Sequence, residues 1–189
     1  MLYLVRHAHA DYSPDEMRGL SPAGRAAARR LADILAGRRI AHIYSSPYTR
    51  AVETVQPLAE RCGLTIQVEH DLRERHLSPG PLDDFERWLA ATWRDFDLAY
   101  PGGESSAAAQ ARVTRAIYRI AVDVEGRSVA IASHGNALAL FLRTLDSAVD
   151  YDFWTRMSMP DVYVVGGQHP TTWSYQRLEY LDDRGVQSE

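Results

Sequence analysis

The chain has 189 residues, of which 46% are hydrophobic and 24% are charged, and its formal net charge is -4. These values are typical of one globular domain and exclude a disordered chain. The acidic balance argues against nucleic acid as the main partner. No apolar run approaches the roughly 20 residues that a membrane-spanning helix needs, and a lone cysteine, Cys62, excludes an internal disulfide. We therefore expect a cytoplasmic protein that binds neither nucleic acid nor membranes.

The first half of the chain alternates short apolar runs with helical patterns. The apolar runs predict strands over residues 2–5, 41–45 and 65–68. A first helix is predicted after the Ser21-Pro22 pair, which is typical of an N-cap and first helical residue, and it ends at Gly37. A second helix is predicted to begin at Pro47 and to run to about Arg61.

The second half continues the alternation. Apolar residues at helical spacing, and capping residues such as Ser105 or Ser106, predict further helices, which cover residues 82–96, about 106–125, 136–145 and 151–157. The remaining strands are predicted over residues 129–132, 162–165 and 173–181. The last two strands fit an antiparallel pair, and residues 182–189 are polar and expected to be frayed.

This alternation predicts an α/β fold, a three-layer α/β/α sandwich with a mostly parallel central sheet. The sequence contains no internal repeat and no linker, so residues 1–189 are expected to form one domain. Residues 74–103 interrupt the alternation with Pro- and Gly-rich turns around an aromatic helical pattern. We expect this segment to be a small helical cap insertion over one end of the sheet.

Chemically active side chains follow the predicted strands. Arg6 and His7 come directly after the first strand, Arg50 follows the second, and His134 follows the fourth. Glu74 comes a few residues after the third strand. Because ligands bind outside the carboxyl ends of strands in open α/β sheets, we expect these five side chains to meet at one site.

This set of residue types suits phosphoryl transfer. The planar forks of Arg6 and Arg50 match the oxygens of a phosphoryl group. A neutral histidine nitrogen can act as the nucleophile, and a carboxylic acid such as Glu74 can protonate the leaving oxygen. The helices expected to begin at Pro47 and Asn136 would add N-terminal backbone N–H groups aimed at the anion.

Five short motifs, in order and at characteristic separations, resemble the histidine phosphatase superfamily, also called phosphoglycerate mutase-like. They are Leu4-Val5-Arg6-His7, Ser46-Pro47-Tyr48-Thr49-Arg50-Ala51, Leu72-Arg73-Glu74, Pro101-Gly102-Gly103-Glu104-Ser105 and Ser133-His134-Gly135. The resemblance covers the whole chain. It implies that the protein is a phosphoric monoester hydrolase of the histidine acid type, without metal or organic cofactor.

The resemblance also implies residue roles. His7 would be the nucleophile that forms a phosphohistidine, and Glu74 would be the carboxylate that protonates the leaving group. Arg6, Arg50 and His134 would complete the catalytic phosphate pocket and bind the substrate. The substrate would be a small phosphorylated molecule or a phosphoprotein.

The sequence departs from the family pattern at three places. Ala8 stands where glycine is usual, and residues 9–19 form a short segment without the family's asparagine, for which Arg18 is a candidate substitute in substrate binding. The residues after Glu74 lack the tryptophan-glutamate-glycine run of the mutases. This last departure favours a phosphatase over a mutase.

Three other functions remain open. One is a phosphoglycerate mutase-type phosphotransferase, and another is a catalytically inactive module that binds phosphate. The third is a metallohydrolase, because His7, His9 and Asp11 form an H-x-H-x-D pattern after a strand and are metal-ligand types. Two arginines beside this pattern argue against a bound cation. The sequence does not indicate an oligomeric state.

Overall fold

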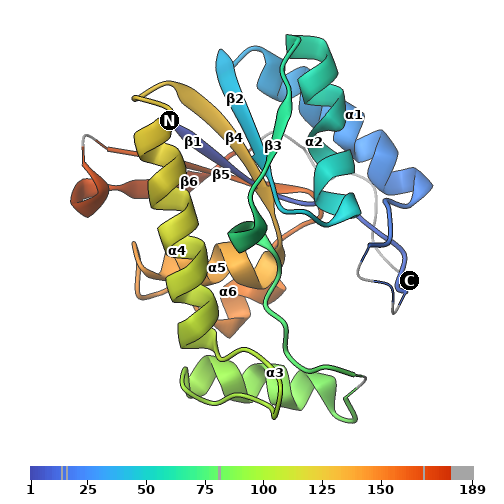
Figure 1. The fold of residues 1–189 in the computed structure, drawn as a ribbon, viewed down its shortest axis with the longest axis vertical. Coiled ribbons are helices and arrows are strands. Elements are labelled where there is room, and N and C mark those ends of the chain that lie inside the picture. The colour runs from blue at the N-terminus through green and yellow to red at the C-terminus, as the bar shows by residue number, and fades with distance from the viewer. Residues whose placement is uncertain (14, 16, 81, 168, 180–189) are drawn as a thin grey trace.

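The computed structural model describes residues 1–13, 15, 17–80, 82–167 and 169–179. Across these residues, six strands form one sheet in the order β3-β2-β4-β1-β5-β6 (Figure 1). Their bounds are β1 (Leu2–Arg6), β2 (Ile40–Ser45), β3 (Ile66–Val68), β4 (Ser128–Ser133), β5 (Asp161–Gly166) and β6 (Ser174–Arg177). β1 to β4 are parallel, whereas β5 is antiparallel to β1 and to β6. The predicted mostly parallel sheet and its antiparallel closing pair are confirmed.

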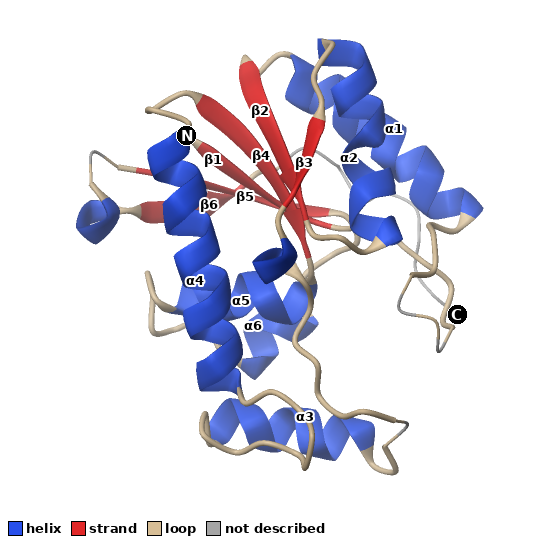
Figure 2. Ribbon diagram, viewed as in Figure 1, coloured by secondary structure: helices blue, strands red, loops and turns tan. Residues whose placement is uncertain are grey.

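Helices cover both faces of this sheet (Figure 2). One face carries α1 (Pro22–Ala36) and α2 (Thr49–Cys62), and the other carries α4 (Ser106–Asp123) and α5 (Gly135–Arg143). α6 (Tyr151–Thr155) lies beside α5, and α3 (Phe85–Arg94) lies beyond the end of the sheet. The three-layer α/β/α sandwich is therefore confirmed. None of the described helices combines the length and apolar character that crossing a membrane requires.

The central strand β1 shows why two helical layers are needed. Leu2 and Leu4 are buried in the cluster shared with α4 and α5, whereas Tyr3 and Val5 are buried in the cluster shared with α1 and α2. Successive side chains of a strand point to opposite faces, so a strand that is apolar at every position must be covered twice. The continuous apolar run at the start of the chain thus fixes a buried central strand.

Most element ends lie within two residues of the predicted ones, and local backbone geometry explains the differences. The second helix begins at Thr49 rather than Pro47, because Tyr48 is an extended N-cap. The cap helix begins at Phe85 rather than residue 82, after Asp84 in the left-handed region at φ 58. The long helix ends before Glu125, which has φ 49.

Two features escaped the sequence patterns. Two 3-10 helices, His70–Leu72 and Pro170–Thr172, are each only three residues long, which is too short to show a periodicity. The last strand ends at Arg177, short of the predicted residue 181. The end of that predicted strand, and the tail 182–189 expected to be frayed, lie outside the described residues.

The segment 74–103, proposed as a cap, carries α3 and contacts the rest of the molecule near the start of α5. Leu89 and Trp93 of α3 are buried in the core cluster that α4 and α5 share. The indole Nε1 of Trp93 donates to the Asn136 side-chain oxygen at 3.1 Å. The segment is thereby anchored one residue away from the Ser133-His134-Gly135 motif.

The start of α1 generates a stability prediction. A Cβ on Gly24 would lie 2.0 Å from the carbonyl oxygen of His9, which also accepts the Ser21 N–H at 3.0 Å. We expect Gly24→Ala to lower the free energy of unfolding by about 1–3 kcal/mol, because the backbone of the first loop has to move. Urea unfolding measures this effect.

The matched control is Gly37→Ala at the other end of α1, where a Cβ meets nothing within 4 Å. This variant is expected to match the original protein closely. Equal stability of the two alanine variants would contradict the close approach of Gly24 to the first loop.

Candidate active site

The carboxyl ends of three neighbouring strands meet at one edge of the sheet. The order β2-β4-β1 places the residues after these strands side by side. The His7 N–H donates to the Ser133 carbonyl at 3.0 Å, and the Ser46 N–H donates to the Ala132 carbonyl at 2.9 Å. Backbone hydrogen bonds therefore continue the sheet pairing into the loops that carry the predicted site residues.

His7 is held at both ring nitrogens. Nδ1 lies 2.7 Å from the carbonyl oxygen of Ala8, and Nε2 lies 3.3 Å from the Nε–H of Arg50. A carbonyl oxygen only accepts and a guanidinium only donates. The neutral ring must therefore carry its proton on Nδ1, which leaves the Nε2 lone pair directed toward Arg50.

Electrostatics keep this ring neutral. Burial is the main cause that lowers the pKa of His7 to about 3. The positive charges of Arg50, Arg6 and Arg18 act in the same direction, whereas the bond to the Ala8 carbonyl acts in the opposite one. At neutral pH Nε2 therefore carries a lone pair, which accepts the hydrogen bond from Arg50.

Arg50 is placed by the first turn of α2. Its side chain is buried, and its guanidinium carbon lies 4.7 Å from the centre of the Tyr48 ring. This stacking supplies a cation–π contact that orients the planar fork. The helix also secures the first loop, because Thr54 accepts the N–H of Ala8 at 2.9 Å and donates to the Arg50 carbonyl at 2.7 Å.

Arg6 lies against the start of α5. Its Nη1 donates to the Met157 carbonyl at 2.6 Å, and its buried Nε has no hydrogen-bond partner among the described residues. A Cβ on Gly135 would lie 3.1 Å from the Arg6 guanidinium carbon and 2.8 Å from the Trp154 indole nitrogen. The glycine of the Ser133-His134-Gly135 motif is therefore required by the close approach of Arg6 and Trp154.

His134 is fully buried between two aromatic rings. Its ring centre lies 5.1 Å from that of His7 and 5.1 Å from that of Tyr48. Nε2 lies 2.7 Å from the hydroxyl oxygen of Ser46, and Nδ1 is buried without a partner in the described part of the chain. Burial is the main cause that lowers the pKa of His134 well below its ordinary value, so this ring is also neutral.

Glu74 is bound to the N-terminus of α5. Its Oε1 accepts the backbone N–H groups of Arg75 and Ala137, both at 2.9 Å, and its Oε2 accepts that of Asn136 at 3.1 Å. The sequence-based expectation that the N–H groups at the start of this helix point at a bound anion is therefore wrong for Asn136 and Ala137. Their partner is the carboxyl group of Glu74, which satisfies the same orphan donors.

Arg112 of α4 holds the segment that carries Glu74. Its Nη1 donates to the carbonyl oxygens of Asp71 at 2.6 Å and Arg73 at 3.0 Å. Its Nε and Nη2 form a bidentate pair with Glu104 at 2.8 and 2.7 Å. Such a buried fork fixes the backbone on the N-terminal side of Glu74 more firmly than a single hydrogen bond does.

Arg18 bonds to its own loop. Its Nη1 donates to the carbonyl oxygens of Ser13 at 3.0 Å and Asp15 at 3.3 Å. Its charge is the smallest of the named causes that lower the pKa of His7 and of His134. Residues 14 and 16 of this loop lie outside the described residues.

Sequence reasoning assigned no role to three side chains that contact the site. They are Ser46 against His134, Tyr48 between His134 and Arg50, and Thr54 beneath the first loop. All three belong to or follow the Ser46–Ala51 motif. Tyr48 and Thr54 follow Ser46 by two and eight residues, and this spacing was the available signal, but a spacing does not reveal a side-chain partner.

The residues of the alternative metal site have other partners. Both ring nitrogens of His7 are engaged by Ala8 and Arg50. His9 Nδ1 lies 2.9 Å from the hydroxyl of Ser21, the residue that caps α1, and 4.0 Å from Asp11. Among the residues that the structure describes, no cluster of three or more His, Cys, Asp or Glu side chains suits a metal ion. A cation at His7 would also have to displace the Arg50 guanidinium.

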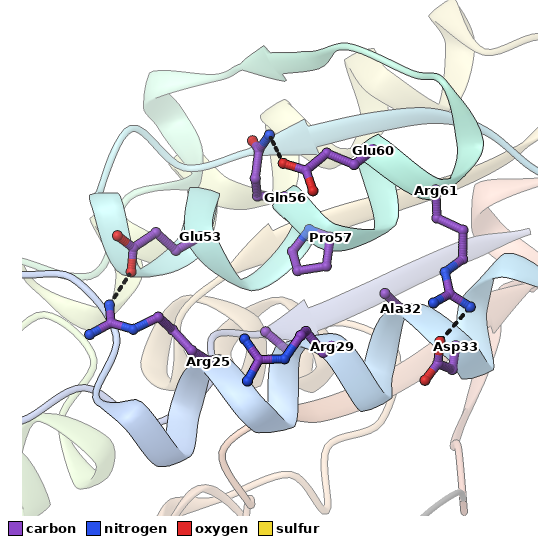
Figure 3. A pocket seen from close by; sticks show the side chains of 10 residues that line it. Arg25, Arg29, Ala32, Asp33, Glu53, Gln56, Pro57, Glu60 and Arg61 are labelled. Carbon is purple, nitrogen blue, oxygen red and sulfur yellow. Dashed lines mark hydrogen bonds and ion pairs between the residues drawn. The ribbon is translucent and has the colours of Figure 1, made fainter.

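A separate surface groove of about 770 Å³ lies between α1 and α2 (Figure 3). Figure 3 shows that ion pairs cross it, with Arg25 against Glu53 at 3.5 Å and Arg61 against Asp33. The groove contains no histidine and no buried nucleophile, and its charges are largely paired with one another. It offers none of the chemistry found at the strand ends.

Comparisons with known proteins agree with the resemblance of the sequence motifs. The family model described as histidine phosphatase superfamily (branch 1) matches residues 2–169. The chain is 32% identical to phosphoglycerate mutase-like protein 4 of Arabidopsis thaliana, over 97% of this chain and 88% of that protein. It is 31% identical to the glucosyl-3-phosphoglycerate phosphatase of Mycobacterium tuberculosis, over 73% and 71% of the two chains. The solved native structure of a mycobacterial glucosyl-3-phosphoglycerate phosphatase superposes with a TM-score of 0.77 at 26% identity, over 93% and 96% of the chains.

The neutral, partly buried His7 predicts an acid-sensitive fold. The pKa of His7 is about 3 in the folded chain and about 6.5 when unfolded, so the unfolded state binds the extra proton between these values. Stability contributed by the neutral ring is complete above about pH 6.5 and is lost as the pH falls toward 3. At pH 5 the loss from His7 alone is about 2 kcal/mol.

Urea unfolding at pH 7.5 and pH 5 measures this loss. We expect His7→Asn to lose less stability over this interval than the original protein does, because the variant lacks the group that takes up the proton. The same pH dependence in both proteins would contradict a His7 ring that is held neutral in the folded state.

Proposed function

Because the chain belongs to the histidine phosphatase superfamily, we propose that it is a metal-independent phosphomonoesterase that forms a phosphohistidine on His7. The observation that carries this proposal is the hydrogen bonding of the His7 ring. Ala8 holds the proton on Nδ1, and Arg50 lies 3.3 Å from the Nε2 lone pair. A nucleophilic nitrogen beside a cation is suited to attack a phosphorus atom whose oxygens carry negative charge.

The first chemical step follows from these positions. Arg6, Arg50 and His134 bind the non-bridging oxygens of the phosphoryl group, and the Nε2 lone pair of His7 attacks the phosphorus. A nitrogen–phosphorus bond forms while the bond from phosphorus to the ester oxygen breaks. The leaving oxygen takes a proton from Glu74, so that the product departs as a neutral alcohol.

The second step regenerates the enzyme. Glu74, now a carboxylate, accepts a proton from a water molecule that attacks the phosphorus. The nitrogen–phosphorus bond breaks, the electron pair returns to His7 Nε2, and inorganic phosphate is released. Glu74 suits both steps because Oε2 accepts only one backbone N–H and keeps a lone pair that can hold a proton.

The proposed substrate is a small phosphate monoester. Two relatives carry names that refer to phosphoglycerate or to its glucosyl derivative, and one of them is a phosphatase. The tryptophan-glutamate-glycine run of the mutases is absent after Glu74, where this chain continues Arg75-His76-Leu77. We therefore propose hydrolysis, of the histidine acid type, rather than transfer to a second acceptor.

The proposal predicts phosphate release from p-nitrophenyl phosphate in the presence of EDTA. His7→Ala is expected to lower the turnover by at least about a thousandfold, because the nucleophile itself is removed. His9→Ala is the matched control. It removes the second histidine of the same loop, which our mechanism does not use and the metal alternative requires.

Activity that EDTA abolishes, or that His9→Ala loses as fully as His7→Ala does, would favour the metallohydrolase. Release of p-nitrophenol by the original protein only when a second phosphate acceptor is present would favour the mutase-type phosphotransferase. Binding of inorganic phosphate without any turnover would favour the inactive module.

A further inference from the structure

Ser46 occupies a position that no role in the mechanism above explains. It follows β2 directly, is fully buried, and its hydroxyl oxygen lies 2.7 Å from His134 Nε2. The same oxygen accepts the backbone N–H of Tyr48 at 3.2 Å. A buried hydroxyl with these two contacts constrains where the proton of the His134 ring can lie.

The constraint follows from counting donors and acceptors. If His134 carried its proton on Nε2, the Ser46 oxygen would accept two N–H groups, and its own hydroxyl proton would need a third partner. If Ser46 instead donates to Nε2, both the hydroxyl proton and the accepted Tyr48 N–H are satisfied. In the second arrangement both the proton and the oxygen of the Ser46 hydroxyl have a hydrogen-bond partner, as buried polar groups usually do. It places the His134 proton on Nδ1.

We propose that Ser46 is a positioning residue that fixes His134 as the Nδ1–H tautomer, so that His134 donates to a phosphoryl oxygen on its way to His7. The inference rests on the proposed function, which supplies the phosphoryl group. His134 Nδ1 is buried without a partner in the described residues, and its ring lies 5.1 Å from the ring of His7. A buried donor in this position is completed by an acceptor oxygen of the substrate.

Both histidines are then protonated on Nδ1, but His7 presents a lone pair to the phosphoryl group and His134 presents a proton. His7 has its proton fixed on Nδ1 by Ala8 and presents the Nε2 lone pair to phosphorus. His134 has its Nε2 lone pair occupied by Ser46 and presents the Nδ1 proton to oxygen. The opposite tautomer of His134 would direct a lone pair at the phosphoryl oxygens, where it would repel the charge that the pocket stabilises.

The tautomer is measured directly by ¹⁵N NMR of histidine-labelled protein at pH 7.5, since protonated and unprotonated ring nitrogens differ in chemical shift. The signals of His134 are assigned from the spectrum of His134→Asn. We expect an Nδ1–H signal in the original protein and a mixture of tautomers in Ser46→Ala. The matched control is Ser45→Ala, because Ser45 is equally buried but its hydroxyl donates to the Ser46 carbonyl at 2.9 Å.

Kinetics give the second readout. Ser46→Ala is expected to lower kcat for p-nitrophenyl phosphate by about tenfold or more, and to weaken inhibition by orthovanadate similarly, because one charge-assisted donor is misplaced. Ser45→Ala is expected to keep both values. An Nε2–H signal from His134 in the original protein overturns the proposal, and so does an unchanged tautomer or unchanged kcat in Ser46→Ala.

The NMR experiment needs no turnover, and the contradicting signal would come from the original protein, with His134→Asn serving only to assign it. It therefore separates the two claims. If the protein lacks phosphatase activity but His134 carries its proton on Nδ1, the proposed function is contradicted and the role of Ser46 in fixing the tautomer still holds. If the protein is active but His134 carries its proton on Nε2, the role of Ser46 is contradicted and the proposed function still holds.

Discussion

The chemistry of this molecule depends on the hydrogen bond between His7 Nδ1 and the carbonyl oxygen of Ala8. This 2.7 Å contact places the only ring proton on the side away from Arg50, so that Nε2 carries the lone pair that the proposed mechanism uses. Its geometry depends in turn on the backbone around it. The His7 N–H is bound by the carbonyl that ends β4, and the Ala8 N–H is bound by Thr54 of α2. The sheet and the first helical layer thus set the tautomer of one residue.

The site also concentrates positive charge in a protein whose net charge is -4. Burial lowers the pKa of Arg6 as well as that of both histidines, because their charged forms lose hydration inside the protein. Natural proteins accept such local costs where function requires them. A phosphoryl group bound by Arg6 and Arg50, as we propose, would replace part of the lost hydration with charge-assisted hydrogen bonds. The same burial is the reason that we expect the fold to be sensitive to acid.

The sequence predicted the sheet and the candidate site because both depend on signals that are local in the chain. Apolar runs marked β1 and β4, and the residues directly after them are those that the structure brings together. Partners from distant segments were not predictable in this way. The Glu74 carboxyl group accepts backbone N–H groups 62 and 63 residues away, so a helix start expected to face an anion already has a partner within the chain. The contact between Ser46 and His134 spans 88 residues and depends on strand order, which no periodicity encodes.

The phosphohistidine itself is the most direct test of the central claim. The original protein is mixed with p-nitrophenyl phosphate, quenched in alkali within the first turnover, and digested for mass spectrometry. Our account predicts one phosphoryl group on the peptide that contains His7, stable in alkali and lost on brief acid treatment, and none in His7→Ala. A phosphoryl group on a carboxylate, or turnover without any covalent adduct in the first cycle, would contradict the account.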